Sequence, residues 1–295
     1  MKKWLGRIYT RVSVRIFGNR IGVVTNLLHY LFGAFLRSIS LFKPWNTMRS
    51  ASDKGMEIRE NGYASVSPVL SEQFLSALSE KIDRLIGRPD QVIGTHTAGG
   101  ILRLKDSFIL LPELEVLLTA PELLNAVCSY FSSPFKVYSC DVYRTFPVET
   151  PIVEENYSLI WHFDNAPHSM LKLMVYITDT PEDRGALTLV PKHTSAELKR
   201  KGFWDRLKMD AFRSTIQEQA RTLPGPKGTC LLFTPQYCIH KATLPQKSYR
   251  DVAVFLLFPS YEFSRFSSEV RRTLSYNFGY LANPFSGRPL RVGDE

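Results

Sequence analysis

The sequence predicts a mainly β fold, a double-sheet jelly roll preceded by flanking helices. Between residues 136 and 260, hydrophobic residues recur at every second position in about seven short segments. This is the period of a strand with one buried face. Turns containing proline, glycine and polar residues separate the segments, which favours packed antiparallel sheets over a parallel α/β sheet. A fold of this kind leaves a pocket between its sheets that suits a metal.

The expected strands lie at 136–145, 157–163, 170–178, 185–190, 228–233, 237–240 and 252–258. Ahead of them, Ser71 can cap a helix whose apolar face runs to Leu85, and Gly87-Arg88-Pro89 ends it. A second helix is expected from Pro112 or Pro121 to about Phe131. The polar stretch 47–62 is interpreted as a linker or as a lead-in to the first helix. We therefore expect one domain from 43 to 295, with its β core at about 136–260.

Composition narrows the functional classes. The chain has 295 residues, 44% of them hydrophobic, which is enough for a substantial core. A formal charge of +9 favours an anionic partner, but the sequence lacks a zinc-finger spacing or an RNA-binding signature, so nucleic acid is not expected. Four scattered cysteines without a Cys-x-x-Cys pair indicate reduced, buried thiols and a cytoplasmic protein. The composition indicates no particular oligomeric state.

Residues 1–42 differ from the rest of the chain. Basic residues from Lys2 to Arg20 alternate with Trp4, Ile8 and other apolar residues at helical spacing, and a short apolar run follows. This pattern fits a basic amphipathic helix at a membrane surface, which would make the protein peripheral to a membrane. A helix that packs on the rest of the protein or on a second subunit is the alternative. The run is short for a membrane span.

The candidate metal ligands are His162, Asp164 and His240. On a strand, residues two apart point to the same side, so His162 and Asp164 would share one space. His240 is the best third ligand. Two imidazoles and one carboxylate form the facial arrangement that holds non-haem Fe(II) and leaves positions open for O₂ and a chelating co-substrate. Arg250 begins an apolar strand ten residues later and can bind a carboxylate bidentately, or pair with Asp251.

These residues occur in a recognisable order: Trp161-His162-Phe163-Asp164, then Gly185-Ala-Leu-Thr-Leu-Val-Pro-Lys-His-Thr-Ser195, then His240 and Arg250. Over about residues 136–260 the sequence resembles the phytanoyl-CoA dioxygenase-like family of Fe(II)/2-oxoglutarate oxygenases. It departs from the family's usual Gly-Ser-His at 192–194. The resemblance implies a cupin-like double-stranded β-helix, braced by N-terminal helices. It also implies an Fe(II) ion on the three ligands and 2-oxoglutarate on Arg250.

Three further residues are candidates for the co-substrate pocket. Lys172 and Arg144 are possible second anion-binding groups, with surface charge as the alternative, and Thr188 either lines the pocket or packs in the core. Residues 195–222 form a basic amphipathic helical insertion. In the resembled family such an insertion often covers the pocket, whereas a solvated helix is the ordinary interpretation.

The expected function is hydroxylation of a C–H bond, with decarboxylation of 2-oxoglutarate to succinate. Asp164 keeps its place on the metal, so no position is freed for a halide. The basic charge and the first 42 residues suggest a small or lipid-like, anionic substrate, such as a lipid-linked sugar or an acyl-CoA. The alternatives are a non-catalytic membrane-associated jelly-roll protein and a cupin-type metal enzyme that does not use 2-oxoglutarate.

Overall fold

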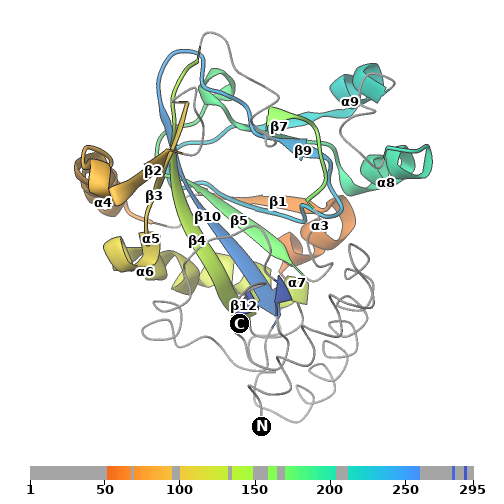
Figure 1. Cartoon of the computed structure of the whole chain (residues 1–295). Helices are drawn as coiled ribbons and strands as arrows, with labels where there is room; N and C mark the ends of the chain where they lie inside the picture. Colours follow the sequence, from red (N-terminus) through yellow and green to blue (C-terminus); the bar gives the residue numbers. More distant parts are fainter. Residues whose placement is uncertain are drawn as a thin grey trace, which may run out of the picture.

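The structure is a computed structural model of the chain (Figure 1). It describes residues 52–67, 70–94, 100–131, 135–148, 159–164, 170–203 and 212–259. Two short strands near the C-terminus, β11 (Leu281–Ala282) and β12 (Pro289–Leu290), are also described and pair with each other. The predicted amphipathic segment 1–42 lies outside these ranges. Within them, no helix has both the length and the apolar character required to cross a bilayer.

The larger of the two main sheets has seven antiparallel strands. They are β1 (Tyr63–Val66), β2 (Val92–Gly94), β3 (Ile101–Leu104), β4 (Phe135–Thr145), β5 (Leu171–Tyr176), β8 (Cys230–Phe233) and β10 (Arg250–Pro259). Their spatial order is β1-β8-β5-β10-β4-β3-β2. β10 therefore lies in the middle of the sheet, between β5 and β4, as its apolar sequence predicts.

The smaller sheet has three short strands, β6 (Leu187–Leu189), β7 (Arg221–Leu223) and β9 (His240–Lys241), in the order β7-β6-β9. Figure 1 shows β7 and β9 above one face of the larger sheet, while α5, α6 and α7 lie on the other side. The predicted jelly-roll architecture is confirmed as two packed antiparallel sheets with added helices. Among the described residues the two sheets remain separate and do not close into a barrel.

Each central strand contributes to two different cores. On β5, Leu171, Leu173 and Val175 join the core under the helices. Met174 and Tyr176, which alternate with them, join a second core with Leu187 and Leu189 of the smaller sheet. β8 and β10 divide their side chains in the same way. The period-two pattern thus separates a face covered by helices from a face directed at the smaller sheet.

The helices follow from local signals. The bounds are α3 (Asp53–Asn61), α4 (Glu72–Ile86), α5 (Ser107–Leu110), α6 (Glu115–Thr119), α7 (Pro121–Phe131), α8 (Lys192–Arg200) and α9 (Arg213–Gln219). Short 3₁₀ helices span Pro89–Gln91, Pro112–Leu114 and Glu182–Arg184. The α4 prediction is confirmed, since the Ser71 hydroxyl accepts a hydrogen bond of 3.3 Å from the Phe74 N–H.

The structure corrects two local predictions. Part of the stretch 47–62, expected to be a linker or lead-in, is α3, which buries Gly55 and Ile58 and ends at Gly62 in the left-handed conformation (φ 85°). So few buried residues leave little apolar periodicity to detect. Of the expected strand 157–163, residues 159–163 contain no strand, and His162 forms only an isolated β-bridge. The chain cannot continue this pairing because the Asp164 N–H turns away to the Pro235 carbonyl (3.0 Å).

The predicted insertion 195–222 is helical only in part. α8 begins earlier, at Lys192, so the residues that depart from the family's Gly-Ser-His form its first turn. α9 follows after a segment, 204–211, outside the described residues. Arg221 and Thr222 then belong to β7 and pair with β6. The end of the insertion is therefore an integral edge of the smaller sheet.

Candidate metal centre

His162 and His240 lie opposite each other across the isolated bridge. The His162 N–H donates to the His240 carbonyl at 3.0 Å, and the reverse bond is 2.9 Å. Residues that exchange both hydrogen bonds in an antiparallel pair project their side chains to the same side. The two imidazoles are consequently neighbours, with ring centroids 4.4 Å apart. A predicted pair of distant histidines is thus brought together by two backbone hydrogen bonds.

The turn before α8 fixes the position of β9. The Val190 N–H donates to the Ile239 carbonyl at 2.8 Å. The buried Ser195 hydroxyl donates to the Val190 carbonyl (2.9 Å) and accepts from the Ile239 N–H (3.0 Å). These bonds hold the residue before His240 against the segment that leaves β6. Ser195 is the last residue of the 185–195 sequence motif, but its bridging hydrogen bonds are visible only in the structure.

Each imidazole has a defined proton position. His162 Nδ1 lies 2.6 Å from the Ile160 carbonyl, and His240 Nδ1 lies 3.0 Å from the Cys238 carbonyl. A carbonyl oxygen only accepts hydrogen bonds, so both Nδ1 atoms carry a proton. In the neutral imidazole this leaves the lone pair on Nε2, as a metal ligand requires.

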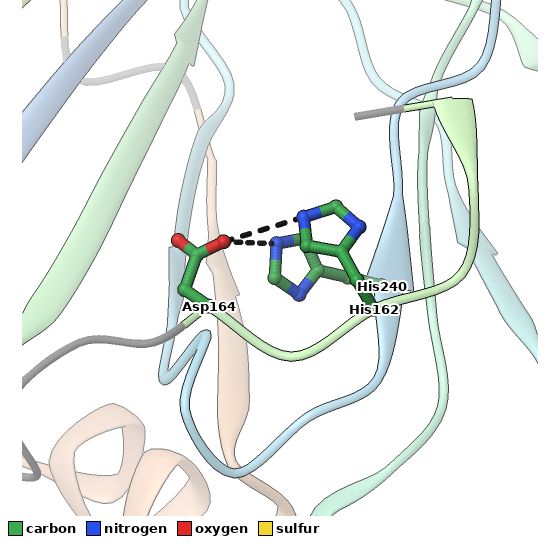
Figure 2. Close-up of side chains that lie close together, drawn as sticks. All are labelled: His162, Asp164 and His240. Atoms are coloured by element: carbon green, nitrogen blue, oxygen red, sulfur yellow. Dashed lines mark ion pairs between the residues drawn. The ribbon is translucent and has the colours of Figure 1, made fainter. Parts of the chain in front are cut away.

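Asp164 completes the group. Its Oδ1 atom lies 3.3 Å from His162 Nε2 and 3.5 Å from His240 Nε2, as Figure 2 shows. The ligand atoms of the three residues all lie within 4.8 Å of one another. Burial lowers the pKa of His240 despite the nearby Asp164 carboxylate. A neutral Nε2 lone pair that faces a carboxylate oxygen is repulsive without a cation between them, so the donor set fits a bound divalent metal.

The Asp164 carboxylate is held from its other side as well. The Lys172 ammonium donates to Oδ2 at 2.6 Å. Burial opposes ionisation of Asp164, but the Lys172 ammonium outweighs it and holds the pKa of the carboxyl well below its usual value. Asp164 is therefore an anion throughout the neutral range.

Arg250 lies at the start of β10 and faces the smaller sheet, since it alternates with the helix-facing Ala253. One Nη atom donates to the Gly185 carbonyl, and the other lies 3.4 Å from the Thr145 hydroxyl. Its Nε is buried and has no hydrogen-bond partner among the described residues. Burial lowers the pKa of this guanidinium, while Tyr176 and Asp251 raise it. An incompletely paired buried guanidinium is well suited to receive a carboxylate.

Gly185 and Thr188 belong to the same neighbourhood. Gly185 has φ 84°, and a Cβ there would lie 2.5 Å from the Thr243 carbonyl and 3.3 Å from Arg250. The Thr243 hydroxyl lies 3.1 Å from that of the buried Thr188. Thr188 contacts Thr243, and Thr243 lies beside Gly185, which Arg250 contacts. Thr243 was not among the residues that the sequence pattern indicated.

Arg144 is not brought to the metal centre. It alternates with Tyr143 on β4, and its guanidinium binds Asp251 with bonds of 2.8 and 2.6 Å. It also contacts Asp83 of α4, on the helix-covered side of the larger sheet. The ion-pair partner of Asp251 is therefore Arg144, the arginine opposite it on β4, and not its sequence neighbour Arg250. An anion bound between the sheets would lie on the opposite face from Arg144.

Comparison with known families agrees with this arrangement. The sequence matches the profile of the phytanoyl-CoA dioxygenase (PhyH) family over residues 58–244. The chain belongs to the PhyH family. Curated protein sequences give no match. The family profile starts inside α3 and ends just beyond β9, so it includes the three candidate metal ligands and stops short of Arg250.

Solved structures share the fold of this PhyH-family chain. The α-ketoglutarate-dependent epimerase SnoN from nogalamycin biosynthesis is 19% identical (TM-score 0.54, covering 84% of this chain and 97% of SnoN). HygX from Streptomyces hygroscopicus, with nickel and 2-oxoglutarate bound, is 13% identical (TM-score 0.52, 72% and 88%). EctD from S. alaskensis, with iron bound, is 11% identical (TM-score 0.53, 70% and 75%).

The PhyH-family chain also has a charged pair that the sequence reasoning missed. Asp141 of β4 lies 3.8 Å from Arg103 of β3. It alternates with the helix-facing Val142, so it faces the smaller sheet, as Lys172 and Arg250 do. Burial raises the pKa of Asp141 to about 6, although Arg103 and Lys172 lower it. The single carboxylate of β4, between the apolar residues Cys140 and Val142, was the signal that could have revealed it.

Proposed function

We propose that this protein is an Fe(II)/2-oxoglutarate-dependent dioxygenase that hydroxylates a C–H bond of a small or lipid-like substrate. The convergence of His162, Asp164 and His240 on one point carries the proposal. PhyH membership supports it, as does the fold shared with proteins whose structures hold iron or nickel and 2-oxoglutarate.

In this proposal the protein's residues bind and orient. His162 and His240 offer Nε2 to the metal because the Ile160 and Cys238 carbonyls hold the protons on Nδ1. Asp164 supplies one negative charge. Bound iron and 2-oxoglutarate would supply the oxidising chemistry together with O₂, one oxygen atom entering succinate as CO₂ is released and the other entering the substrate as its hydroxyl group. Arg250 binds the distal carboxylate of 2-oxoglutarate, and Tyr176 and Phe233 exclude water from the space between the sheets.

The test is conversion of 2-oxoglutarate to succinate with added Fe(II), measured without a substrate as uncoupled turnover. We expect His162→Ala to abolish turnover and Arg250→Ala to weaken it. His193→Ala is the matched control, because His193 is an exposed histidine of α8 with a side chain 81% accessible. Iron binding without dependence on 2-oxoglutarate would instead indicate a cupin-type metal enzyme. Absence of iron binding would indicate a non-catalytic jelly-roll protein.

Hydroxylation is the reaction we propose among those that such enzymes perform. The structural neighbours include an epimerase, SnoN, and a carbocyclase, SnoK, so the shared fold is compatible with several outcomes. Asp164 supports hydroxylation over halogenation because it occupies the ligand position a halide would need. Mass spectrometry of the product decides: hydroxylation adds one oxygen atom, whereas epimerisation leaves the mass unchanged and ring closure by dehydrogenation lowers it.

We further propose an anionic amphiphile as substrate and a peripheral location at a membrane surface. The net charge of +9 and the basic amphipathic sequence of residues 1–42 support this. In a flotation assay with anionic vesicles, the full chain should rise with the vesicles more than a chain that lacks residues 1–42. Equal partitioning of the two would contradict the proposal.

A further inference from the structure

The two oxygens of the Asp164 carboxylate have different surroundings. Oδ1 faces both imidazoles, at 3.3 and 3.5 Å from their Nε2 atoms. Oδ2 is directed elsewhere and accepts the 2.6 Å bond from Lys172. The Asp164 N–H is also bonded, to the Pro235 carbonyl. Asp164 is therefore held by its backbone N–H and by Oδ2. Oδ1 is the carboxylate oxygen that remains available to a metal bound by His162, Asp164 and His240.

Lys172 is itself held in place. It belongs to β5, where it pairs with Phe233 of β8 and Leu256 of β10. Its ammonium lies 5.6 Å from the centroid of the Phe233 ring, and the same ring lies 5.4 Å from the His240 ring. Its side chain is only 17% exposed. A lysine packed in this way loses little further freedom when it donates to Asp164, so the bond is firm.

From this arrangement we propose that Lys172 is a positioning residue that restricts Asp164 to one-oxygen metal binding. The inference rests on the proposed function, because it presupposes a metal on the three ligands. By holding Oδ2, Lys172 prevents the carboxylate from chelating through both oxygens. Two imidazoles and one oxygen leave three positions of an octahedron open, which is what a bidentate 2-oxo acid and O₂ together require. A chelating carboxylate would take one of those positions.

This role differs from the sequence-based expectation that Lys172 binds 2-oxoglutarate. A lysine that binds the co-substrate matters only when the co-substrate is present. A lysine that restrains Asp164 alters the metal complex before 2-oxoglutarate is added. The two roles are therefore separable in the binary complex of protein and metal.

The experiment uses Co(II) as a spectroscopic substitute for Fe(II), because its visible bands respond to the number and the type of its ligands. For Lys172→Met we expect a Co(II) spectrum that differs from that of the unmodified protein in the absence of 2-oxoglutarate, because the second oxygen of Asp164 joins the metal or displaces a water from it. We also expect 2-oxoglutarate to bind the Co(II) form about 10- to 100-fold more weakly, the usual effect of losing a partner of a metal ligand. Lys172→Arg, which can still donate to Oδ2, should retain the original spectrum.

Lys241→Met is the matched control. Lys241 is adjacent to His240, but its ammonium lies 4.9 Å from the centre of the Trp161 ring, on the side of α8 and α9. Its loss should leave the Co(II) spectrum unchanged. Thermal unfolding of each variant verifies that the protein remains folded, and Lys172→Leu, which likewise has no hydrogen-bond donor, replaces Lys172→Met if the latter unfolds.

The outcomes separate the two proposals. If the unmodified protein binds neither Co(II) nor Fe(II), the proposed function fails and the role of Lys172 fails with it. If the unmodified protein binds metal and 2-oxoglutarate but Lys172→Met gives the same Co(II) spectrum, only the positioning role is overturned. Weaker 2-oxoglutarate binding with an unaltered spectrum would also overturn it, and would assign Lys172 to the co-substrate.

Discussion

Arg144 and Arg250 lie on neighbouring strands, one step apart in the β4–β10 register, yet their surroundings are opposite. Arg144 pairs with Asp251, while Arg250 is opposite Thr145. Arg144, on the helix-covered face, has two carboxylate partners, and its guanidinium stacks 3.9 Å from the centre of the Tyr249 ring. Arg250, on the face toward the smaller sheet, contacts a carbonyl and a hydroxyl, and its Nε has no hydrogen-bond partner in the part of the chain that the structure describes.

The comparison shows that the face of the sheet determines what a buried cation does. A charge that is buried for stability needs a fully bonded opposite charge, as Arg144 has. A charge without such a partner raises the free energy of the folded protein unless a ligand supplies one. Arg250 is of the second kind. Helices seal the first face with apolar side chains, whereas the second face also carries Lys172 and Asp141, with the candidate metal ligands beyond it.

The largest expected effect is on the helix-covered face. Arg144→Met leaves Asp251, which is fully buried, without its partner and should lower the free energy of unfolding by about 3–5 kcal/mol. Urea denaturation measures this loss. Arg84→Met, which removes an exposed arginine from α4, is the control and should cost little.

A double variant tests whether the Arg144 effect comes from the ion pair. Adding Asp251→Asn to Arg144→Met removes the orphaned charge, so the pair of substitutions should destabilise less than the sum of the single ones. Additive losses, or a single Arg144→Met loss below about 1 kcal/mol, would mean that the helix-covered face does not depend on this pair.

On the other face, the effect should be on binding. Arg250→Met should weaken 2-oxoglutarate binding to the metal-loaded protein by about 2–3 kcal/mol, roughly 30- to 150-fold, through loss of charged hydrogen bonds. Titration calorimetry measures the affinity. Stability should fall less than in Arg144→Met because no carboxylate loses its partner. Arg250→Lys keeps the positive charge but loses the bidentate geometry of the guanidinium, so it should bind 2-oxoglutarate with intermediate affinity. Unchanged affinity in Arg250→Met would remove Arg250 from the site.

The sequence was sufficient for the features that depend on period and order. Alternation predicted β4, β5, β8 and β10, and the order of the motifs pointed to the three candidate metal ligands that the fold brings together. The sequence was insufficient where two residues of the same type, close together in the sheet, differ in the side of the sheet that they face. Arg144 and Arg250 are both arginines in strands with many apolar residues, and excluding Arg144 from the pocket required the register of β4 against β10, which only the fold supplies. β1, β2, β3 and β7 were missed because three or four residues give too little alternation.

A third, smaller effect concerns Asp141, which lies on the same face as Arg250 and forms a long ion pair of 3.8 Å with Arg103. Its pKa in the folded protein is about 6, above the usual value for aspartate, so the folded state binds a proton more strongly than the unfolded chain does. Its contribution to stability therefore falls as the pH rises from about 4 to about 6, and it stays lower above that window.

Asp141→Asn should remove this pH dependence. The full shift corresponds to a little under 3 kcal/mol, and weakening of the 3.8 Å contact with Arg103 leaves an expected gain of about 2 kcal/mol at pH 7. Urea denaturation of both proteins from pH 4 to pH 8 measures the difference, which should vanish near pH 4. A gain that persists unchanged at pH 4 would show that ionisation of Asp141 is not its cause.

The smallest effect tests whether the two faces are energetically separate. Ser71→Ala removes the cap of α4, far from the metal ligands in sequence and on the helix-covered face, and should lower the free energy of unfolding by about 1 kcal/mol or less. Ser79→Ala, inside the same helix, should be neutral or slightly stabilising because alanine favours the helical interior. Neither change should alter the affinity for Co(II) or 2-oxoglutarate. If Ser71→Ala alone changed either affinity, the stability of the helical layer would affect ligand binding between the sheets. The two faces would then be energetically coupled.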